Sequence, residues 1–209
     1  MNRRRSIDDP DAVVQHLRSA LGSPAQTDLG RSRSRVRRWF AAAAPLIQWD
    51  EMRSPLGALF VAVSSRGICA LDFGRQESAF FLRLDPLARL EKNPAAVRHV
   101  MEQLHEYFAG SRPQVHLPVD LSALTPFHQS VLEVAREIAP GQVWTYQRVA
   151  ARLGRPQCSR PVGQALARNP VPIVVPCHRV VASNGSLGGY SGGSGIQAKR
   201  WLLRLEQAL

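Results

Sequence analysis

The residues best suited to chemistry lie around Cys177, which stands between Pro176 and His178 in an apolar segment. A thiol becomes an effective nucleophile as its thiolate, and a neighbouring imidazole is one way to remove the proton. After a long stretch without acidic residues, a single carboxylate follows at Glu206, on a predicted helix whose inner face must pack nearby. Cys177, His178 and Glu206 therefore predict a nucleophile, a base, and a group that orients the base.

The spacing of Cys177 and His178 limits how their side chains can meet. Adjacent residues of an extended strand point to opposite faces, so the contact must run through a water molecule or a local bend. The opposing interpretation of Cys177 is a buried free cysteine that acts as a small hydrophobic residue. Cys69 and Cys158 keep that interpretation, because neither has a histidine beside it. The three cysteines form no C-x-x-C pair, which argues against a disulfide framework or a zinc finger and favours a reducing compartment.

Basic charge is unevenly distributed along the chain. The formal net charge is +11, and residues 125–209 hold 10 of the 27 Lys and Arg residues but 3 of the 16 acidic residues. No acidic residue lies between Glu137 and Glu206. An acid-free basic stretch suits contact with the phosphates of a nucleic acid, whereas the alternative is a basic surface with no partner.

The elements that must position these residues begin after residue 45. The composition of residues 1–45 predicts a basic, flexible extension. Arginine, serine and aspartate are frequent there. The segment could add loose affinity for DNA, but a solvated tail is the favoured interpretation. The chain has no apolar run of about 18 residues and no apolar core followed by a cleavage site near its start. We therefore expect neither a membrane span nor a secretory signal.

Residues 46–122 predict a first globular domain of mixed α/β type. Alternating apolar residues indicate strands, and the apolar stripe behind Asn93 and Pro94 indicates a capped helix. The predicted elements are a strand at 59–63, a hairpin turn at 64–67, a strand at 68–73, helices at 77–84 and 94–109, and an extended segment at 115–121.

Residues 123–209 predict a second, mainly helical domain. Thr125 and Thr145 each stand at a helix start, and Gly and Pro separate the helices. Two short helices around a tight break are typical of a helix-turn-helix. The predicted elements are helices at 125–139, 146–153 and 159–168, buried extended segments within 170–181, a Gly- and Ser-rich loop at 183–195, and a last helix at 198–209.

The segment Pro176-Cys177-His178-Arg179-Val180, preceded by Asn169-Pro170-Val171-Pro172, resembles the acceptor motif of the O6-alkylguanine-DNA alkyltransferases. The likeness covers roughly residues 46–209 and is strongest in the second half. It implies a fold of class α/β plus α, with an N-terminal ribonuclease-H-like α/β domain and a C-terminal helical domain that holds a helix-turn-helix. It also implies a monomer without a cofactor that binds double-stranded DNA through the minor groove and flips the damaged guanine into a pocket.

The resemblance implies five catalytic residues. Cys177 is the alkyl acceptor, His178 is the base that acts through a water molecule, and Glu206 orients His178. Tyr146 donates a hydrogen bond to the flipped base, and Asn169 ties the recognition helix to the active-site loop. Without the resemblance, Tyr146 would be interpreted more simply as a half-buried aromatic residue of a helix with no catalytic role.

The resemblance also implies a set of groups that bind the DNA and the flipped base. Arg160 fills the space that the flipped base leaves, although taken alone it reads as a surface contact to phosphate. Val180 offers its backbone carbonyl to the guanine amino group, as does Cys177. Tyr190 and Ser191 belong to the loop that closes the pocket, with Ser191 as a donor near O6, and Lys199 matches a lysine at the start of the last helix.

These residues together predict DNA repair by irreversible transfer of an alkyl group from O6-alkylguanine, with O4-alkylthymine as a minor substrate, to Cys177. Each molecule would react once. The rival functions are a lesion-binding protein without transfer and a helix-turn-helix regulator, neither of which needs the cysteine, histidine and glutamate together. A cysteine hydrolase would leave the basic stretch unexplained.

Two features depart from the family pattern. The loop at 192–197 is longer than in well-known members, which bears on the size of the pocket. Ser64 and Cys69 stand where two ligands of a structural zinc are expected, so we expect no metal. The expected location is the cytoplasm, in association with the nucleoid, in a bacterium or archaeon, and the nucleus in a eukaryote.

Overall fold

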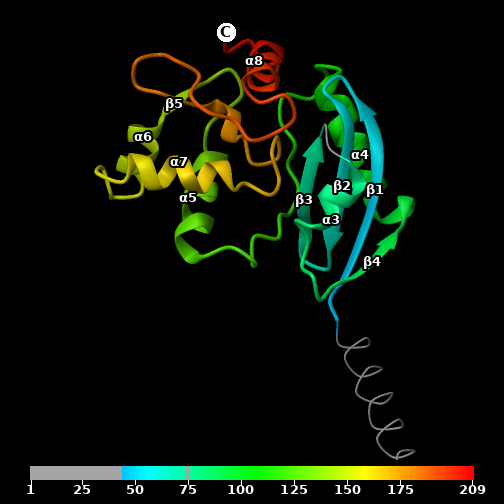
Figure 1. Ribbon diagram of the computed structural model, residues 1–209. Coiled ribbons are helices and arrows are strands. Elements are labelled where there is room, and N and C mark those ends of the chain that lie inside the picture. Colours follow the sequence, from blue (N-terminus) through cyan, green and yellow to red (C-terminus); the bar gives the residue numbers. More distant parts are fainter. Residues whose placement is uncertain (1–43, 74–75) are drawn as a thin grey trace, which may run out of the picture. The chain divides into compact units, whose positions relative to one another are not determined.

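The computed structural model describes residues 44–73 and 76–209 (Figure 1). Pro45–Leu209 is one compact unit. The predicted extension at 1–45 therefore lies almost wholly outside the described residues. Within the part that is described, no helix is both long and apolar enough to cross a membrane.

A four-stranded sheet forms the N-terminal half of this unit. Its strands are β1 Leu46–Ser54, β2 Gly57–Ser64, β3 Gly67–Phe73 and β4 Arg89–Lys92. The order across the sheet is β3-β2-β1-β4, and β4 alone runs parallel to its neighbour. The predicted strands at 59–63 and 68–73 are confirmed as parts of β2 and β3.

Strands β1 and β4 have no counterpart in the sequence prediction. In β1, Asp50 and Glu51 interrupt the apolar alternation, although Ile47 and Trp49 are buried. Strand β4 has the sequence RLEK and lies at the edge of the sheet, where it pairs with β1. A charged edge strand of this kind becomes extended because a partner offers hydrogen bonds, which local sequence does not reveal.

The hairpin between β2 and β3 depends on Gly67. Its φ is +136°, and a Cβ atom there would lie 2.4 Å from the carbonyl oxygen of Pro118. The two segments come this close because the amide of Ile68, the next residue, donates a hydrogen bond of 2.9 Å to the same carbonyl. The predicted extended segment at 115–121 is thereby held beside the start of β3, and only glycine fits at the crossing.

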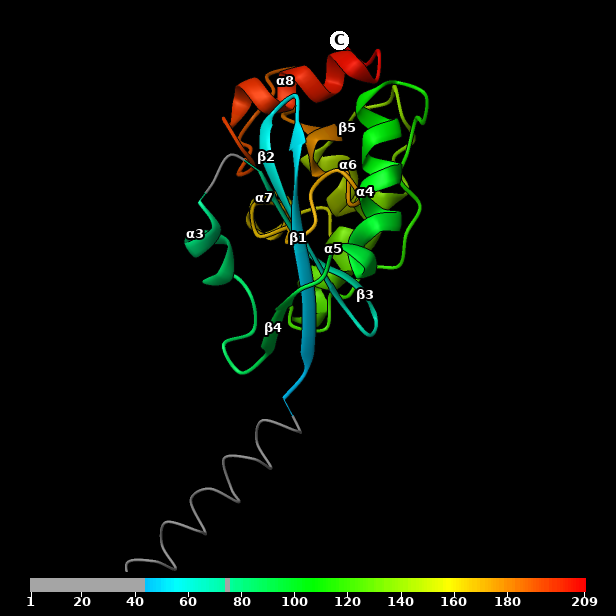
Figure 2. The same ribbon diagram turned by 90° about the vertical axis from the view of Figure 1, so that its right-hand side faces the viewer.

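Helices α3 Glu77–Phe81 and α4 Pro94–Phe108 lie on opposite faces of the sheet (Figure 2). Strand β2 serves both faces by alternation: Phe60 joins the cluster around Phe80, while Val61 joins the larger core that includes α4. The helix predicted at 94–109 is confirmed. The helix predicted at 77–84 is shorter than expected and ends at Phe81, after which the amides of Arg83 and Leu84 donate to carbonyls three residues back, as in turns.

The C-terminal half is mainly helical (Figure 1). Helix α5 packs against α6 and α7, and α6 packs against α7. The predicted helices at 125–139, 146–153 and 159–168 are confirmed, with small differences at their ends. The elements are α5 Pro126–Arg136, β5 Trp144–Thr145, α6 Tyr146–Arg152, α7 Ser159–Ala167, the 3₁₀ helix η1 Cys177–Arg179, β6 Val180–Val181 and α8 Ile196–Leu205.

Two predictions for the C-terminal half were wrong in detail. The segment at 170–181 is extended only at β6, because its three prolines cannot donate to a strand ladder and Cys177–Arg179 forms a 3₁₀ helix. The last helix, predicted at 198–209, ends at Leu205. Gln207 has a φ of 57°, which a continuing right-handed helix excludes.

The two halves share one apolar core. A single cluster of buried side chains includes Leu71 and Phe73 of β3, Val162 of α7 and Leu202 of α8. The Leu71 amide also donates to the carbonyl of Pro170 over 2.7 Å. The sheet therefore supports the segment that follows α7, and this segment leads directly to Cys177.

Candidate active site

Cys177 lies in the short helix η1, where its thiol is buried among the groups that follow α7. The side chain of Asn169 holds this segment at three residues. Its amide donates to the Cys177 sulfur over 3.1 Å and to the Val175 carbonyl over 2.8 Å, while its oxygen accepts from the Val171 amide over 3.0 Å. Asn169 thus joins the end of α7 to the turn that carries the thiol.

The backbone between Asn169 and Cys177 contains one strained residue. Ile173 is buried and has a φ of 75°, a region that β-branched residues rarely adopt. The turn around it is closed by a hydrogen bond of 3.0 Å from the Val175 amide to the Val171 carbonyl. Such strain persists only where surrounding contacts fix the backbone, and here it shapes the approach to the thiol.

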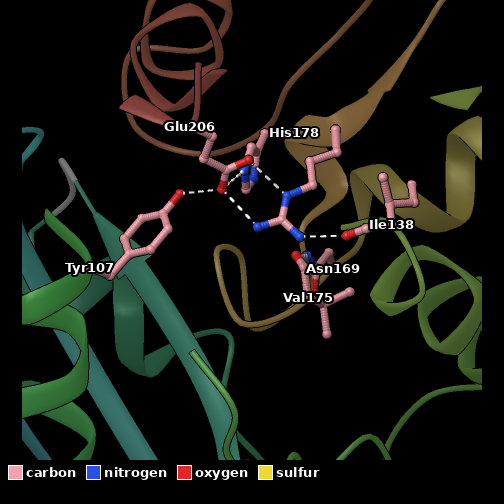
Figure 3. Close-up of polar contacts among 7 residues, drawn as sticks. Tyr107, Ile138, Asn169, Val175, His178 and Glu206 are labelled. Carbon is pink, nitrogen blue, oxygen red and sulfur yellow. Dashed lines mark hydrogen bonds and ion pairs between the residues drawn. The ribbon is translucent and has the colours of Figure 1, made fainter. Parts of the chain in front are cut away.

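A buried polar network centres on Glu206 and includes His178, the residue after Cys177 (Figure 3). His178 Nε2 lies 2.9 Å from Glu206 Oε1, and the hydroxyl of Tyr107 donates to the same oxygen over 2.7 Å. Arg179 donates from Nε to Oε2 and from Nη2 to Oε1, each over 2.8 Å. Its remaining Nη1 donates to the Ile138 carbonyl over 2.5 Å. Glu206, which the sequence placed on the last helix, is the C-cap residue of α8.

The network contains two residues that sequence reasoning missed. Arg179 is wholly buried. Its partner could have been inferred, since a buried arginine needs an acid and Glu206 is the first acid after Glu137. Tyr107 belongs to the apolar stripe of α4, and nothing in the local sequence distinguishes its hydroxyl from that of a tyrosine that reaches solvent.

The relation of Cys177 to His178 follows from the helical turn. The short helix η1 is a local bend, but among the described residues no hydrogen bond joins the Cys177 thiol to the His178 side chain, so the expected contact stays a prediction. His178 Nε2 faces an ionised carboxylate, so it carries the proton and leaves Nδ1 as the acceptor. Nδ1 is buried and has no hydrogen-bond partner among the described residues. One acceptor of the imidazole is therefore available to take a proton.

Burial and pairing set the protonation of the network. Burial would raise the pKa of Glu206, but the hydrogen bonds from His178 and Arg179 outweigh it and bring that pKa to about 2. Burial lowers the pKa of His178, against the attraction of Glu206. At neutral pH the carboxylate is therefore charged and the imidazole is neutral, which is the state of a base ready to accept a proton.

The thiol is also affected by burial. Burial raises the pKa of Cys177, while the hydrogen bond from Asn169 and the charge of Lys199 act to lower it. Lys199 itself is buried, which lowers its pKa to about 8. Its ammonium donates to the Val180 carbonyl over 2.5 Å and to the Gly189 carbonyl over 3.4 Å. Lys199 thus joins β6 to the loop before α8, and its charge favours the thiolate.

A cavity of about 310 Å³ opens onto Cys177. Tyr146 of α6 forms one wall, and Tyr190 and Ser191 from the loop before α8 form another. Gly188 lets this loop approach Tyr146, because a Cβ atom at Gly188 would lie 2.9 Å from the tyrosine hydroxyl. A cavity of this size is at the lower end for small-molecule sites, about 300–1,000 Å³.

Residues 47–121 match the family model of the ribonuclease-like domain of 6-O-methylguanine DNA methyltransferase. Residues 126–208 match the DNA-binding domain of the same family. The chain belongs to this family of DNA-repair methyltransferases. Among relatives, the methylated-DNA–protein-cysteine methyltransferase of Methanosarcina barkeri is 35% identical over 76% of this chain and 96% of its own. The constitutive enzyme of Bacillus subtilis is 36% identical over 74% of this chain and 92% of its own.

Solved structures agree with the family assignment. The crystal structure of Mycobacterium tuberculosis OGT in complex with DNA has a TM-score of 0.67 and 34% identity, over 77% of this chain and 93% of that one. The O6-methylguanine-DNA methyltransferase of Pyrococcus kodakaraensis has a TM-score of 0.54 and 27% identity. The methyltransferase fold of this chain thus has a sheet-rich N-terminal half and a helical C-terminal half.

Arg160, predicted to fill the space that a flipped base leaves, does not line the cavity at Cys177. Arg160 is exposed on α7, whose buried side is formed by Val162 and Leu166. Other exposed arginines lie on α6, between α6 and α7, and at the C-cap of α7: Arg148, Arg152, Arg155 and Arg168. Arg148 lies over the ring of Trp144 at 4.2 Å, so its guanidinium is partly ordered before any partner binds.

Ser64 and Cys69, the two positions at which the resemblance implied zinc ligands, both lie near Asp120. The hydroxyl of Ser64 donates to Asp120 over 2.6 Å. Burial and the nearby charge of Asp120 raise the pKa of Cys69 to about 11, so this thiol holds its proton at neutral pH. Among the residues that the structure describes, no group of three His, Cys, Asp or Glu side chains could hold a metal ion.

Proposed function

We propose that this methyltransferase removes the alkyl group from O6-alkylguanine in double-stranded DNA and keeps it on Cys177. The observation that carries the proposal is the position of the thiol between an open cavity and a buried histidine–glutamate pair. A thiol that was only a core residue would need neither the cavity nor the imidazole acceptor behind it. O4-alkylthymine would be a minor substrate of the same site.

The chemistry is an in-line displacement at the alkyl carbon. The bond from the Cys177 sulfur to carbon forms while the bond from O6 to carbon breaks, and the electron pair of the broken bond stays on the guanine. The thiol proton passes to His178 through a bridging water, and Glu206 faces the imidazolium that results. Tyr146 donates a proton to the guanine as charge develops and regains one from His178 through solvent. A thiol and O6-methylguanine thus become a thioether and guanine, and each molecule reacts once.

Two features support Tyr146 as the donor. Burial raises the pKa of Tyr146, so its hydroxyl holds its proton at neutral pH. The side chain also lines the same cavity as Cys177.

The carbonyls of Cys177 and Val180 would accept hydrogen bonds from the guanine amino group. Because a carbonyl has two lone pairs, the bond from Lys199 leaves Val180 free to do so.

The loop before α8 would complete the pocket for the base. The ring of Tyr190 stands 6.4 Å from the ring of Phe73, which supports it from the sheet. The hydroxyl of Tyr190 is buried without a hydrogen-bond partner among the described residues. Ser191 is exposed at the mouth of the cavity, where a hydroxyl could donate near O6.

We further propose that α6 and α7 act as a helix-turn-helix whose second helix enters the minor groove. Extrusion of a stacked base costs a few kcal/mol, and Arg160 would offset part of this cost by filling the space that the base leaves. The exposed arginines on α6 and α7 would contact phosphates. In this proposal the protein acts as a monomer, with a ribonuclease-H-like domain at 46–122 and the helical domain at 123–209.

The decisive experiment is the intact mass of the protein after incubation with a DNA duplex that contains one O6-methylguanine. We expect a single methyl increment that maps to Cys177 and is absent from Cys177→Ala. Cys69→Ala is the matched control and should gain the methyl group like the parent protein. Tight binding to the duplex without any increment would refute transfer and leave a lesion-binding protein.

A further inference from the structure

Tyr107 lies in the N-terminal half of the molecule but reaches the polar network of the C-terminal half (Figure 3). It stands 99 residues before Glu206, and its hydroxyl donates to Glu206 Oε1 over 2.7 Å. The side chain is buried, and its ring packs in the apolar stripe of α4 with Leu104. A phenylalanine would fill the same apolar space, so packing alone does not explain the hydroxyl.

Glu206 Oε1 is shared by three donors from two parts of the chain. His178 and Arg179 come from η1, next to the thiol. Tyr107 comes from α4 and, among the described residues, is the one donor from the N-terminal half. The carboxylate at the end of α8 is therefore held from both sides, and its orientation toward His178 depends on a residue far from the acceptor motif.

We infer that Tyr107 is a positioning residue of the methyl-transfer site, which holds the Glu206 carboxylate and limits how strongly it draws the proton of His178. The inference rests on the proposed function of Cys177 and His178. Tyr107 touches neither the thiol nor the cavity that would take the base. It acts through Glu206 alone, on the step in which the thiol proton moves to the imidazole.

The electrostatic consequence can be stated from the groups that face His178. These are Glu206 from α8, which attracts a proton, and Arg179 and Lys199, which oppose one. A hydrogen bond from Tyr107 spreads part of the negative charge of Glu206 onto the phenol. Without that bond the carboxylate attracts the imidazole proton more strongly, so the pKa of His178 rises and the acid limb of the pH–rate profile moves to higher pH. Above that limb transfer is slower because Glu206, no longer held by Tyr107, is less well oriented to stabilise the imidazolium.

The size of the effect is limited by a second cavity. This cavity, of about 390 Å³, is lined by Tyr107, Arg112, Gly141 and Glu206. A water molecule that enters it could replace part of the missing hydrogen bond. We therefore expect the rate constant for transfer to fall roughly tenfold, at the lower end of what a hydrogen bond to a charged group contributes.

The test is a single-turnover experiment on Tyr107→Phe with saturating duplex that contains O6-methylguanine. Because each molecule reacts once, the final fraction methylated counts folded active protein, while the rate constant reports the chemistry. We expect an unchanged fraction, a rate constant about tenfold lower at pH 7, and an acid limb of the pH–rate profile that moves to higher pH. Phe108→Leu is the matched control. Phe108 lies on the same helix as Tyr107, and its ring packs 6.1 Å from the ring of Trp201, but it makes no hydrogen bond to Glu206.

Each outcome decides between the alternatives. If Tyr107→Phe keeps the parental rate constant and pH profile, or if Phe108→Leu shifts them equally, the positioning role is wrong and Tyr107 is a packing residue. If Tyr107→Phe lowers only the fraction methylated, its role is in stability. If the parent protein transfers no methyl group, the proposed function itself fails, which the intact mass of the parent shows before any variant is made.

Discussion

Two Arg–Glu ion pairs of the helical half have nearly the same length but different surroundings. Arg179 Nε lies 2.8 Å from Glu206, and both side chains are almost fully buried, at 0% and 2% exposure. Arg152 Nε lies 2.9 Å from Glu137, with 58% and 42% of the two side chains exposed. Solvent screens the second pair and supplies other hydrogen bonds, whereas the first pair has only its protein partners. Burial, rather than distance, therefore determines what each pair contributes.

The largest expected effect comes from breaking the buried pair. Arg179→Met would leave the Glu206 carboxylate buried without two of its hydrogen bonds. We expect a loss of about 3–5 kcal/mol in the free energy of unfolding, measured by urea denaturation at pH 7. Arg152→Met is the matched control and should cost about 0–1 kcal/mol. Equal losses in the two variants would contradict the difference between the pairs.

The second prediction concerns the dependence of stability on pH. The pKa of Glu206 is about 2 in the folded protein against an ordinary value of 4.5. Its contribution is fully present above pH 4.5 and is lost as the pH falls toward 2, because the folded carboxylate must then take up a proton. The stability gap between the parent protein and Glu206→Gln should therefore narrow by about 3 kcal/mol between pH 6 and pH 2. A gap that stays constant over this range would mean that the carboxylate is not held ionised by its partners.

A third prediction extends the contrast between buried and exposed surroundings to glycine. Gly193 and Gly185 both have positive φ, at +50° and +81°. A Cβ atom on Gly193 would lie 2.3 Å from the ring of Phe73, while the space around Gly185 is open. Gly185→Ala should cost about 1 kcal/mol from backbone strain, and Gly193→Ala about 1–3 kcal/mol more, measured by thermal unfolding. Because Phe73 also supports Tyr190, Gly193→Ala should slow transfer as well, and a normal rate would show that the loop adapts.

The smallest effect on stability is expected at Arg160. This side chain is exposed on α7, so Arg160→Ala should change the free energy of unfolding by less than about 0.5 kcal/mol. Binding to a duplex that contains O6-methylguanine should nevertheless weaken, roughly tenfold, in a fluorescence titration. The two arginines thus predict opposite patterns. Loss of Arg179 should lower the free energy of unfolding although Arg179 is buried and does not contact DNA, whereas loss of Arg160 should weaken DNA binding and leave the free energy of unfolding almost unchanged. A destabilised Arg160→Ala with normal affinity would reverse that assignment.

Much of the local structure follows from the sequence alone. The helix at Pro94–Phe108 is predicted by its apolar stripe and by Asn93, whose side chain accepts from the amides of Ala95 and Ala96. Thr145 likewise accepts from the Arg148 amide at the start of α6. Caps and helical periodicity involve residues within a few positions of one another, so they can be read from a short window. The pairing of a cysteine with an adjacent histidine is local in the same sense.

Other features depend on partners that are distant in the chain. Strand β4 is extended because β1 lies beside it, and Arg179 can be buried because Glu206 reaches it from α8. The hydroxyl of Tyr107 has a function only because α4 packs where α8 ends. The sequence by itself thus determined the acceptor motif, most helices and two strands. The tertiary structure alone decided which polar side chains are buried together, since the energy of a buried charge depends on every group that surrounds it.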